Sequence, residues 1–343
     1  MTTHPYAELH AHSYFSFLEG ADAPEDYIAR AQQLGLTSLA LLERDGMYSL
    51  IRALRAAREI SFPMLIGTEL TLSPKQFSLY TEKASHQMKG WGLPRGWEDT
   101  GIRLPVLTTS AQGYRGLCAM MSEHTLEAGV EENLAYSLEN IVHCGDDIRI
   151  LTGSARGPLR RILYTQGRTQ AERFLKDLIA LFGRERVLIE SVLRPGEDII
   201  GAELAHLAHA NRLTLVATGA VTMASPQSKY RADPLCALRQ GSSLDEIRGM
   251  LPAQHPFLRS GEEMLALHRS APYAVANAAA IARECYYPMT FESLDLPDVE
   301  VPEGYTTIEW LRLVTYAKAQ ERYGERCAHS QAWQTIDHEL TII

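Results

Sequence analysis

Two histidines separated by a single residue, His10 and His12, lie near the N-terminus of the chain, directly after a short apolar segment. Residues 6–9 have the composition of a β-strand, and alternate residues of a strand point to the same side. Both imidazoles can therefore reach one metal ion. Two surface histidines at the end of a strand would give the same pattern, so the pair alone favours neither interpretation.

Two glutamates offer further metal ligands. Glu19 lies in the loop that follows His12, and Glu69 closes the apolar segment of residues 63–70. A buried carboxylate needs a partner, which can be a metal ion or the guanidinium of an arginine. Glu19 by itself would be interpreted as a solvated loop residue, and it becomes a candidate ligand because the two histidines precede it.

Short apolar segments alternate with segments of helical periodicity over residues 6–217. Strands are expected at residues 6–9, 37–42, 63–70, 77–80, 104–107, 148–151, 187–190 and 214–217, and helices at residues 24–34, 47–60, 111–122, 169–182 and 201–211. This alternation predicts a parallel sheet covered by helices, and the number of strands favours a closed α/β barrel. Active sites of such barrels lie at the C-terminal ends of the strands, where the two histidines and Glu69 stand.

The remainder of the chain is expected to lie outside the barrel or to interrupt it. Residues 83–103, with Trp91 and Trp97, are expected to form an exposed, mobile loop. Residues 286–306 are rich in proline and acidic residues and are expected to form an extended linker.

Two helices are expected after this linker, at residues 307–324 and 329–343. Apolar residues of the second helix fall on one stripe, at Trp333, Ile336, Leu340 and Ile343. Two helices alone are not expected to bury both of their apolar stripes. We therefore expect an exposed apolar patch centred on Leu340 and Ile343.

Composition and charge limit the class of protein. The 343 residues carry a formal net charge of −9, and sequence-independent DNA binding usually needs a basic face. This region is therefore not expected to bind DNA by itself, unless a local basic face lies within the acidic total. The five cysteines are odd in number and far apart in sequence, which fits reduced thiols in the cytoplasm. No signal peptide or long apolar segment is found, so no contact with a membrane is expected.

The order of several motifs resembles one known family. YAELHAHSYFSFLEGA, ALLERDGMYSLIRAL and LIGTEL, followed by LPVLTTSAQGYRGL, LTGSARGPL, VLIES and LVATGAVTMASP, are similar to the polymerase and histidinol phosphatase (PHP) domain. The version that opens the alpha subunit of bacterial DNA polymerase III, in its error-prone branch, is the most similar. The tail segments WLRLVTYAKAQERYG and DHELTII continue this resemblance. It implies a distorted (β/α)7 TIM-like barrel over residues 1–285, the linker of residues 286–306, and a helical lead-in over residues 307–343 toward a polymerase palm.

The resemblance also implies a metal site that has lost ligands. Active members hold a cluster of metal ions with His, Asp, Glu and Cys. His10 and His12 match the opening pair, Glu69 matches the strand-end glutamate, and Glu19 stands where an aspartate is usual. Other positions of the family pattern carry poor or unsuitable ligands, at Arg44, Arg103, Ser154, Ala220 and Thr222.

These replacements decide the expected chemistry. Hydrolysis at a multinuclear site needs ions that polarise the phosphoryl oxygen and generate hydroxide, and each ion needs about four ligands. We therefore expect no catalytic residue and no cofactor, or at most one weakly bound zinc, manganese or magnesium ion. Arg44 is expected to pair with Glu69 or Glu19 and to supply positive charge that metals supply in the family.

The expected function follows from the replaced metal ligands and from the lack of polymerase catalytic residues. No Asp-x-Asp pair of a polymerase palm occurs in the sequence. We expect a structural and interaction domain of an error-prone polymerase III alpha-like protein, bound to the palm or thumb of that protein or to other replication and translesion proteins, with DNA contacted only through the full polymerase. One alternative is a metal-dependent phosphoesterase or 3′–5′ exonuclease, and another is a free-standing small-molecule phosphatase.

Overall fold

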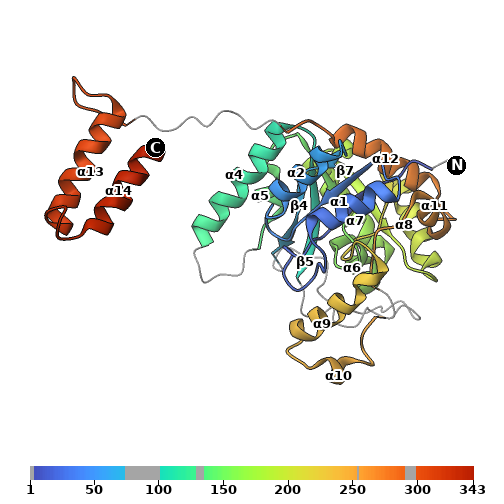
Figure 1. The fold of residues 1–343 in the computed structure, drawn as a ribbon. Coiled ribbons are helices and arrows are strands. Elements are labelled where there is room, and N and C mark those ends of the chain that lie inside the picture. The colour runs from blue at the N-terminus through green and yellow to red at the C-terminus, as the bar shows by residue number, and fades with distance from the viewer. Residues whose placement is uncertain (1–3, 74–100, 129–134, 253–254, 290–298) are drawn as a thin grey trace. The chain divides into compact units, whose positions relative to one another are not determined.

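Two compact units make up the chain, Met1–Met289 and Thr290–Ile343. The structure is a computed structural model that describes residues 4–73, 101–128, 135–252, 255–289 and 299–343 (Figure 1). The strand expected at residues 77–80, and the expected loop up to residue 100, lie outside these ranges.

Strands in the first unit form two sheets. The first sheet contains three parallel strands, β1 (Ala7–Ala11), β2 (Ser38–Leu41) and β3 (Met64–Leu65). The second contains five strands in the order β4 (Gly67–Leu72), β5 (Ile102–Thr108), β6 (Ile148–Leu151), β7 (Val187–Val192) and β8 (Thr214–Thr218). These positions agree with the apolar segments from which the strands were predicted.

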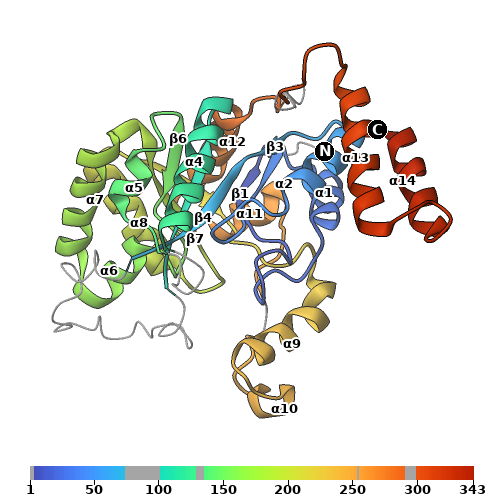
Figure 2. The ribbon, with the colours of Figure 1, turned by 90° about the vertical axis from the view of Figure 1, so that its left-hand side faces the viewer.

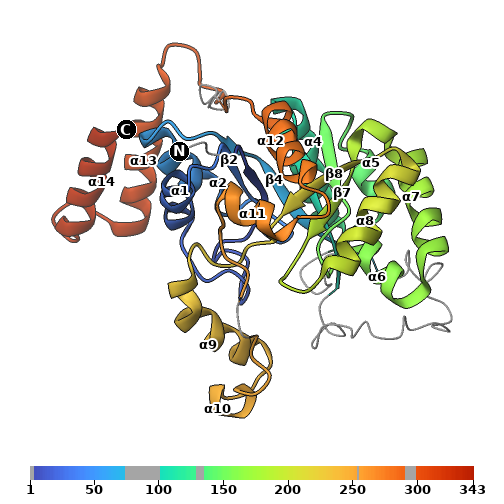
Figure 3. The same ribbon diagram turned by 90° about the vertical axis from the view of Figure 1, so that its right-hand side faces the viewer.

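The two sheets join into one ring. β3 and β4 are separated only by Ile66, so they act as one bent strand and the described ring has seven strands. On the other side, His12 donates its backbone N–H to Val221 O (2.8 Å), and the N–H of Val221 is donated to His10 O (2.9 Å). These bonds connect β1 to the segment after β8. The expected α/β barrel class is thereby confirmed, and Figures 2 and 3 show the strands enclosed by helices.

One strand runs against the expected direction. β5 is antiparallel to both β4 and β6, whereas the other described strand pairs are parallel. Thr71 pairs with Arg103 in the register of β4 and β5. The beginning of β5 therefore lies at the end of the barrel where the other strands finish. Arg103, expected within an exposed loop, is instead buried in this strand.

Helices cover the outside of the ring. Those of the first half are α1 (Pro24–Gln33), α2 (Leu50–Glu59), α4 (Ala111–Ala128), α5 (Leu138–Val142), α6 (Pro158–Gln166) and α7 (Arg168–Phe182). Those of the second half are α8 (Asp198–Asn211), α9 (Lys229–Arg239), α10 (Leu244–Ile247), α11 (Gly261–Leu267) and α12 (Tyr273–Cys285). α9 and α10 extend away from the barrel in all three views (Figures 1, 2 and 3).

The local sequence accounts for these helices. In α7, Phe174, Leu175, Leu178 and Phe182 recur at helical spacing, and all four are buried. α11 begins with a capping box, in which Ser260 Oγ accepts the N–H of Glu263 at 3.2 Å. Apolar periodicity thus sets which face a helix buries, and caps set where it begins.

A close backbone approach fixes the loop that carries Glu19. A Cβ atom added at Gly20 would lie 2.0 Å from the backbone oxygen of Ser13, so only glycine fits at this point. The loop therefore folds tightly back onto the end of β1. Glu19 is held next to the histidines by this contact and is itself buried.

The second unit is a pair of helices, α13 (Thr307–Tyr323) and α14 (Ser330–Ile342). Tyr316 donates its hydroxyl to Asp337 Oδ1 (2.8 Å), and its ring stacks on Trp333. Leu340 is buried, so the expected apolar patch centred on it is wrong at this residue. Ile343 is 73% exposed, in agreement with the expectation.

The barrel unit extends past the end expected for it. Tyr287 and Met289 pack against the core of the first unit, and the hydroxyl of Tyr287 lies 2.8 Å from Thr108 Oγ1. Residues 286–289, expected in the linker, therefore belong with the barrel. Within the described ranges, no helix has both the length and the apolar character needed to cross a membrane.

Candidate metal site and arginine cluster

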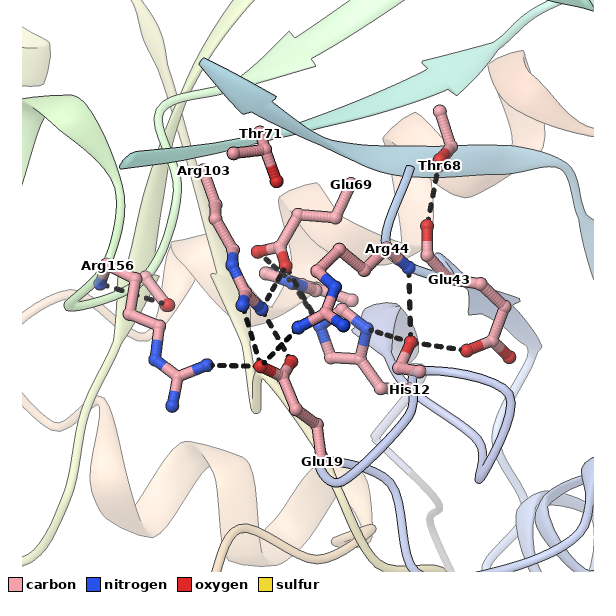
Figure 4. A network of polar contacts seen from close by, with 12 residues as sticks. His12, Glu19, Glu43, Arg44, Thr68, Glu69, Thr71, Arg103 and Arg156 are labelled. Atoms are coloured by element: carbon pink, nitrogen blue, oxygen red, sulfur yellow. Dashed lines mark hydrogen bonds and ion pairs between the residues drawn. The ribbon is translucent and has the colours of Figure 1, made fainter. Parts of the chain in front are cut away.

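His10 and His12 meet at the C-terminal end of β1, as predicted. Their Nε2 atoms are 3.1 Å apart, and both residues are buried. Glu69 of β4 completes the group, with Oε1 3.2 Å from His10 Nε2 and Oε2 3.5 Å from His12 Nε2. The three residues offer ligand atoms within 4.8 Å of one another, so among the described residues they could hold one metal ion. Figure 4 shows Glu69 and His12 within this network.

The outer nitrogens of the two imidazoles have partners that orient the rings. His10 Nδ1 lies 2.7 Å from Glu190 Oε1, an oxygen that also accepts the hydroxyl proton of Thr218. His12 Nδ1 lies 3.1 Å from Ser16 Oγ. A carboxylate on the far nitrogen of a histidine is typical of metal ligands, because it fixes the tautomer and the ring. This donor set fits one ion with three ligands from the protein.

The acids around His10 also let it carry a proton in place of an ion. Burial by itself lowers the pKa of His10, but Glu190 and Glu69 outweigh burial and raise the pKa well above its usual value. Burial lowers the pKa of His12, and the neighbouring charge of His10 adds to this effect. A protonated His10 beside a neutral His12 therefore satisfies the two facing nitrogens without metal.

Glu19 is bound by arginine and not by the histidine group. Arg103 forms a two-pronged ion pair with it, Nη1 to Oε2 at 2.5 Å and Nη2 to Oε1 at 2.7 Å. The same Nη1 lies 3.3 Å from Glu69 Oε2. Arg103 is 4% exposed, so one buried guanidinium neutralises both acids. The sequence predicts this role for Arg44, but Arg103 takes the larger part of it.

Two more guanidiniums converge on Glu19 from the rim of the site (Figure 4). Arg156 Nη1 lies 2.9 Å from Oε1, and Arg44 Nη1 lies 3.3 Å from the same oxygen. The predicted ion pair of Arg44 is therefore confirmed with Glu19. The Arg44 side chain is 34% exposed, so this pair is at the surface of the cluster.

The arginines set the ionisation of the acids. Burial alone would raise the pKa of Glu19, but Arg103 and then Arg156 lower it to about 2. Burial acts on Glu69 in the same way, and the histidines and Arg103 bring its pKa well below the usual range. Both acids are thus carboxylates at neutral pH, with protein cations as partners.

The remaining replaced positions make other contacts. Ser154 Oγ accepts the backbone N–H of Arg156 at 3.5 Å, and Thr222 Oγ1 donates to Pro256 O at 3.5 Å. Ala220 has a φ of 43°, in the left-handed region. Among the described residues, no hydrogen bond joins the Ser154 or Thr222 side chain to the two histidines, although Ala220 and Thr222 flank Val221, whose backbone bonds to His10 and His12.

Three contributors were not predicted as site residues. Glu43 follows β2 and accepts hydrogen bonds from the hydroxyls of Ser13 and Ser16, and Ser16 connects it to His12. Glu190 lies in β7. Both are acids at the end of an apolar segment, the same signal that identified Glu69. Arg156 has no comparable signal, because it lies in a loop.

Every acid of the site therefore has protein partners of its own. Glu19 has three guanidiniums, Glu69 has two imidazoles and a guanidinium, and Glu190 has an imidazole and a hydroxyl. Burying Glu19 and Glu69 therefore does not require a metal ion, whereas Glu190 Oε2 is buried without a hydrogen-bond partner. One ion fits at the histidines, but the donors of a larger metal cluster are not assembled among the described residues.

Comparison with known proteins identifies the family of this chain. Residues 8–192, just over half of the chain, match the PHP domain. The chain is 36% identical to an error-prone DNA polymerase of Nocardia farcinica (strain IFM 10152), over 99% of this chain and 32% of that protein. It is 36% identical to one of Mycolicibacterium paratuberculosis (strain ATCC BAA-968 / K-10), over 99% of this chain and 30% of that protein. The chain thus spans about a third of the length of these curated relatives.

Among solved structures, the chain is similar to an amidohydrolase from Chromobacterium violaceum. The TM-score is 0.43 and the identity 19%, and the match covers 64% of this chain and 88% of that protein.

Proposed function

Because the chain belongs to the PHP domain family, we propose that it is a structural and interaction domain of an error-prone polymerase III alpha-like protein, and that it does not hydrolyse phosphate esters. The observation that carries this proposal is the position of Arg103. Its buried guanidinium binds Glu19 through two nitrogens and reaches Glu69 through one of them. The acids that would attract a metal cluster are already neutralised.

Electrostatics supports this proposal. Metal ions in this family would polarise a phosphoryl oxygen and lower the pKa of bound water. A divalent ion at the histidines would share Glu69 with Arg103, whose Nη1 lies 3.3 Å from it. Like charges this close in a buried site repel strongly, and arginine does not lose its proton to relieve the repulsion. Arg103 therefore weakens the remaining site for any cation.

The proposed partners follow from the extent of the similarity. The chain matches about a third of each error-prone polymerase, so the remainder of such a protein, its palm and thumb, is the proposed partner. Other replication or translesion proteins are further partners in damage-tolerant synthesis in the cytoplasm. With a net charge of −9, the domain itself is proposed to contact DNA through the full polymerase.

One observation favours a second candidate function. His10, His12 and Glu69 form a three-ligand group with an orienting carboxylate on His10. A single ion held there would support a metal-dependent phosphoesterase or a 3′–5′ exonuclease. The three-ligand group favours this enzymatic function over a domain without any metal site. The charge of Arg103 next to Glu69 argues against it.

Hydrolysis assays separate the two candidates. The full chain would be incubated with a chromogenic phosphodiester, small phosphate monoesters and a 3′-labelled oligonucleotide, each with zinc, manganese or magnesium. We expect no turnover above background. His12→Ala is the matched variant: activity that disappears in it would establish the enzyme and overturn the structural proposal, whereas activity that persists in it would come from a contaminant.

A further inference from the structure

Two adjacent surface pockets lie at the end of the barrel opposite to the histidine group. α8 and α12 both pack against β8, and the first pocket, of about 500 Å³, lies where α8 ends and where β8 and α12 begin (Figure 3). β8 begins at Thr214, and its last residue, Thr218, contacts Glu190 beside the histidines, so the pocket is at the far end of this strand.

The two pockets together have the chemistry of a nucleotide site. We propose that they bind a nucleoside monophosphate, with the base in the first pocket and the phosphate in the second. This inference goes beyond the proposed structural role, because it assigns a ligand to a part of the barrel away from the metal site and needs no hydrolysis.

The first pocket can hold a flat ring. The buried side chains of Leu213 and Leu215 line it, together with Tyr273 from the beginning of α12. Tyr273 is 51% exposed, so part of its ring is open to a ligand. A planar base that packs on a tyrosine ring and on leucine side chains removes apolar surface from water on both partners. The volume of this pocket also lies within the range of about 300–1,000 Å³ that small-molecule sites have.

Polar side chains in the first pocket favour a heterocycle over a hydrocarbon ring. Asn277 donates one amide N–H to Leu215 O at 2.9 Å, so its second N–H and its carbonyl oxygen remain for a ligand. His209 and Thr214 also line the pocket, and in the described part of the chain neither side chain makes a hydrogen bond. All three side chains can donate and accept hydrogen bonds, and nucleobases carry both donors and acceptors on their edges.

The second pocket is positively charged. It has a volume of about 360 Å³ and is lined by Lys176, Arg184 and Arg212, of which Arg212 also lines the first pocket. Among the described residues that line the two pockets there is no aspartate or glutamate. Guanidinium groups bind phosphate oxygens through paired N–H donors, and the ammonium of lysine adds a point charge. A phosphate attached to a ring in the first pocket therefore has three cations in the adjoining pocket.

Two of these three cations have no partner within the described ranges. Arg184 donates Nη1 to Asn211 O, the last carbonyl of α8. No hydrogen bond or ion pair joins the side chain of Lys176 or of Arg212 to another described residue. Single surface cations are often only solvated, but these two face one pocket that has no acid to neutralise them. Their donors are therefore available to an anionic ligand.

The C-terminal end of α8 does not cancel this charge. A helix C-terminus carries about half a negative charge, which is less than the charge of the three cations. Its carbonyl groups already have donors: Leu207 O accepts from Asn211 Nδ2, His209 O from the backbone N–H of Arg212, and Asn211 O from Arg184. The guanidinium of Arg212 is therefore not needed by the end of the helix.

The backbone of Arg212 is held in a conformation that arginine rarely adopts. Its φ is 53° and its ψ is 44°, in the left-handed region, where glycine or asparagine is usual after a helix. The turn depends on its backbone N–H, which bonds to Ala208 O and His209 O, and not on its side chain. Backbone strain of this kind is concentrated at functional sites. A ligand for the guanidinium accounts for an arginine at a position that suits glycine.

Calorimetric titration of the full chain with AMP tests the proposal, in a chelator and at constant ionic strength. We expect saturable binding of AMP, and weaker binding of adenosine and of inorganic phosphate, because each lacks one half of the ligand. Arg212→Gln and Tyr273→Ala should each weaken AMP binding about tenfold, through the loss of a charge-assisted contact and of ring packing.

A second variant of Arg212 separates binding from folding. Arg212→Gly removes the guanidinium and also suits the left-handed backbone. It should bind AMP as weakly as Arg212→Gln does, with a melting temperature no lower than that of the parent. A loss of binding in a protein of unchanged or greater stability cannot come from unfolding.

Two control variants leave both pockets intact. Arg248 follows α10, pairs with the exposed Asp245 at 2.7 Å and lines neither pocket, so Arg248→Gln should leave AMP affinity unchanged. Arg44→Gln tests for binding at the arginine cluster at the other end of the barrel, and it should also leave AMP affinity unchanged.

A short oligonucleotide with a 5′-phosphate separates two sources of the ligand. Tighter binding than that of AMP identifies the end of a nucleic-acid strand, and weaker binding identifies the free nucleotide. Three results would overturn the proposal: no saturable binding of AMP, binding of inorganic phosphate as tight as that of AMP, or a loss of binding in Arg44→Gln or Arg248→Gln that equals the loss in Arg212→Gln.

Discussion

Replacing Arg103 by glutamine should destabilise the barrel more than any other single change at an arginine of the cluster. The side chain is buried and pairs with Glu19 through two nitrogens and with Glu69 through one. Glutamine is neutral and too short to replace the bidentate contact of the guanidinium with Glu19. The variant removes a positive charge next to the buried carboxylates of Glu19 and Glu69. A buried negative charge without a nearby positive charge lowers the free energy of unfolding.

The magnitude can be set from the partners that remain. Removing one partner of a buried ion pair costs about 3–5 kcal/mol. Glu19 would still have Arg156 at 2.9 Å and Arg44 at 3.3 Å, and Glu69 would still have the two histidines. We therefore expect the lower end, about 3 kcal/mol. Arg44→Gln should cost about 1 kcal/mol or less, because its side chain is partly exposed and the other guanidiniums stay.

Urea unfolding followed by circular dichroism measures these free energies. Arg186→Gln serves as the control, because it breaks an ion pair with the exposed Asp146 (2.7 Å) away from the cluster and should cost no more than about 1 kcal/mol. The double variant Arg103→Gln, Glu19→Gln should be more stable than the sum of the single changes, because it removes both charges together. If Arg103→Gln costs no more than the control, the cluster does not hold the fold together and the reasoning fails.

Two further predictions concern the pH dependence of the unfolding free energy and the hydrogen exchange of α14. The folded pKa of Glu19, about 2, lies below its ordinary value of 4.5, so its stabilisation is present above pH 4.5 and is lost as the pH falls toward 2. Between these values the unfolding free energy should fall less steeply in Glu19→Gln than in the parent, and parallel curves would contradict this. In hydrogen exchange, α14 should open more readily than β1, because only Trp333 and Leu340 of α14 are buried; equal protection would argue against it.

The strands and the first ligands were predictable because their signals are local. A short apolar segment between polar residues identifies a strand wherever it pairs, and a strand-end residue identifies the rim of the barrel. This reasoning found His10, His12 and Glu69. Applied consistently, it would also have found Glu43 and Glu190, which close two other apolar segments.

The role of Arg103 was not predictable, because it depends on strand direction. An alternating pattern of strands and helices indicates parallel pairing, which would place the start of β5 at the far end of the barrel. β5 is antiparallel to its neighbours, so its first residues reach the site. Pairing of this kind is decided by contacts distant in sequence. Arg156 was not predictable for a different reason: it lies in the loop after β6, whose conformation is not indicated by a local apolar pattern.

Metal content tests the central claim most directly, namely that arginines hold the acids that metals hold elsewhere in the family. The measurement is elemental analysis of the purified chain after growth with zinc and manganese. We expect well under one tightly bound ion per chain, because Glu19 is taken up by three guanidiniums and Glu69 is shared with Arg103. A reproducible content of two or three ions per chain would contradict this account.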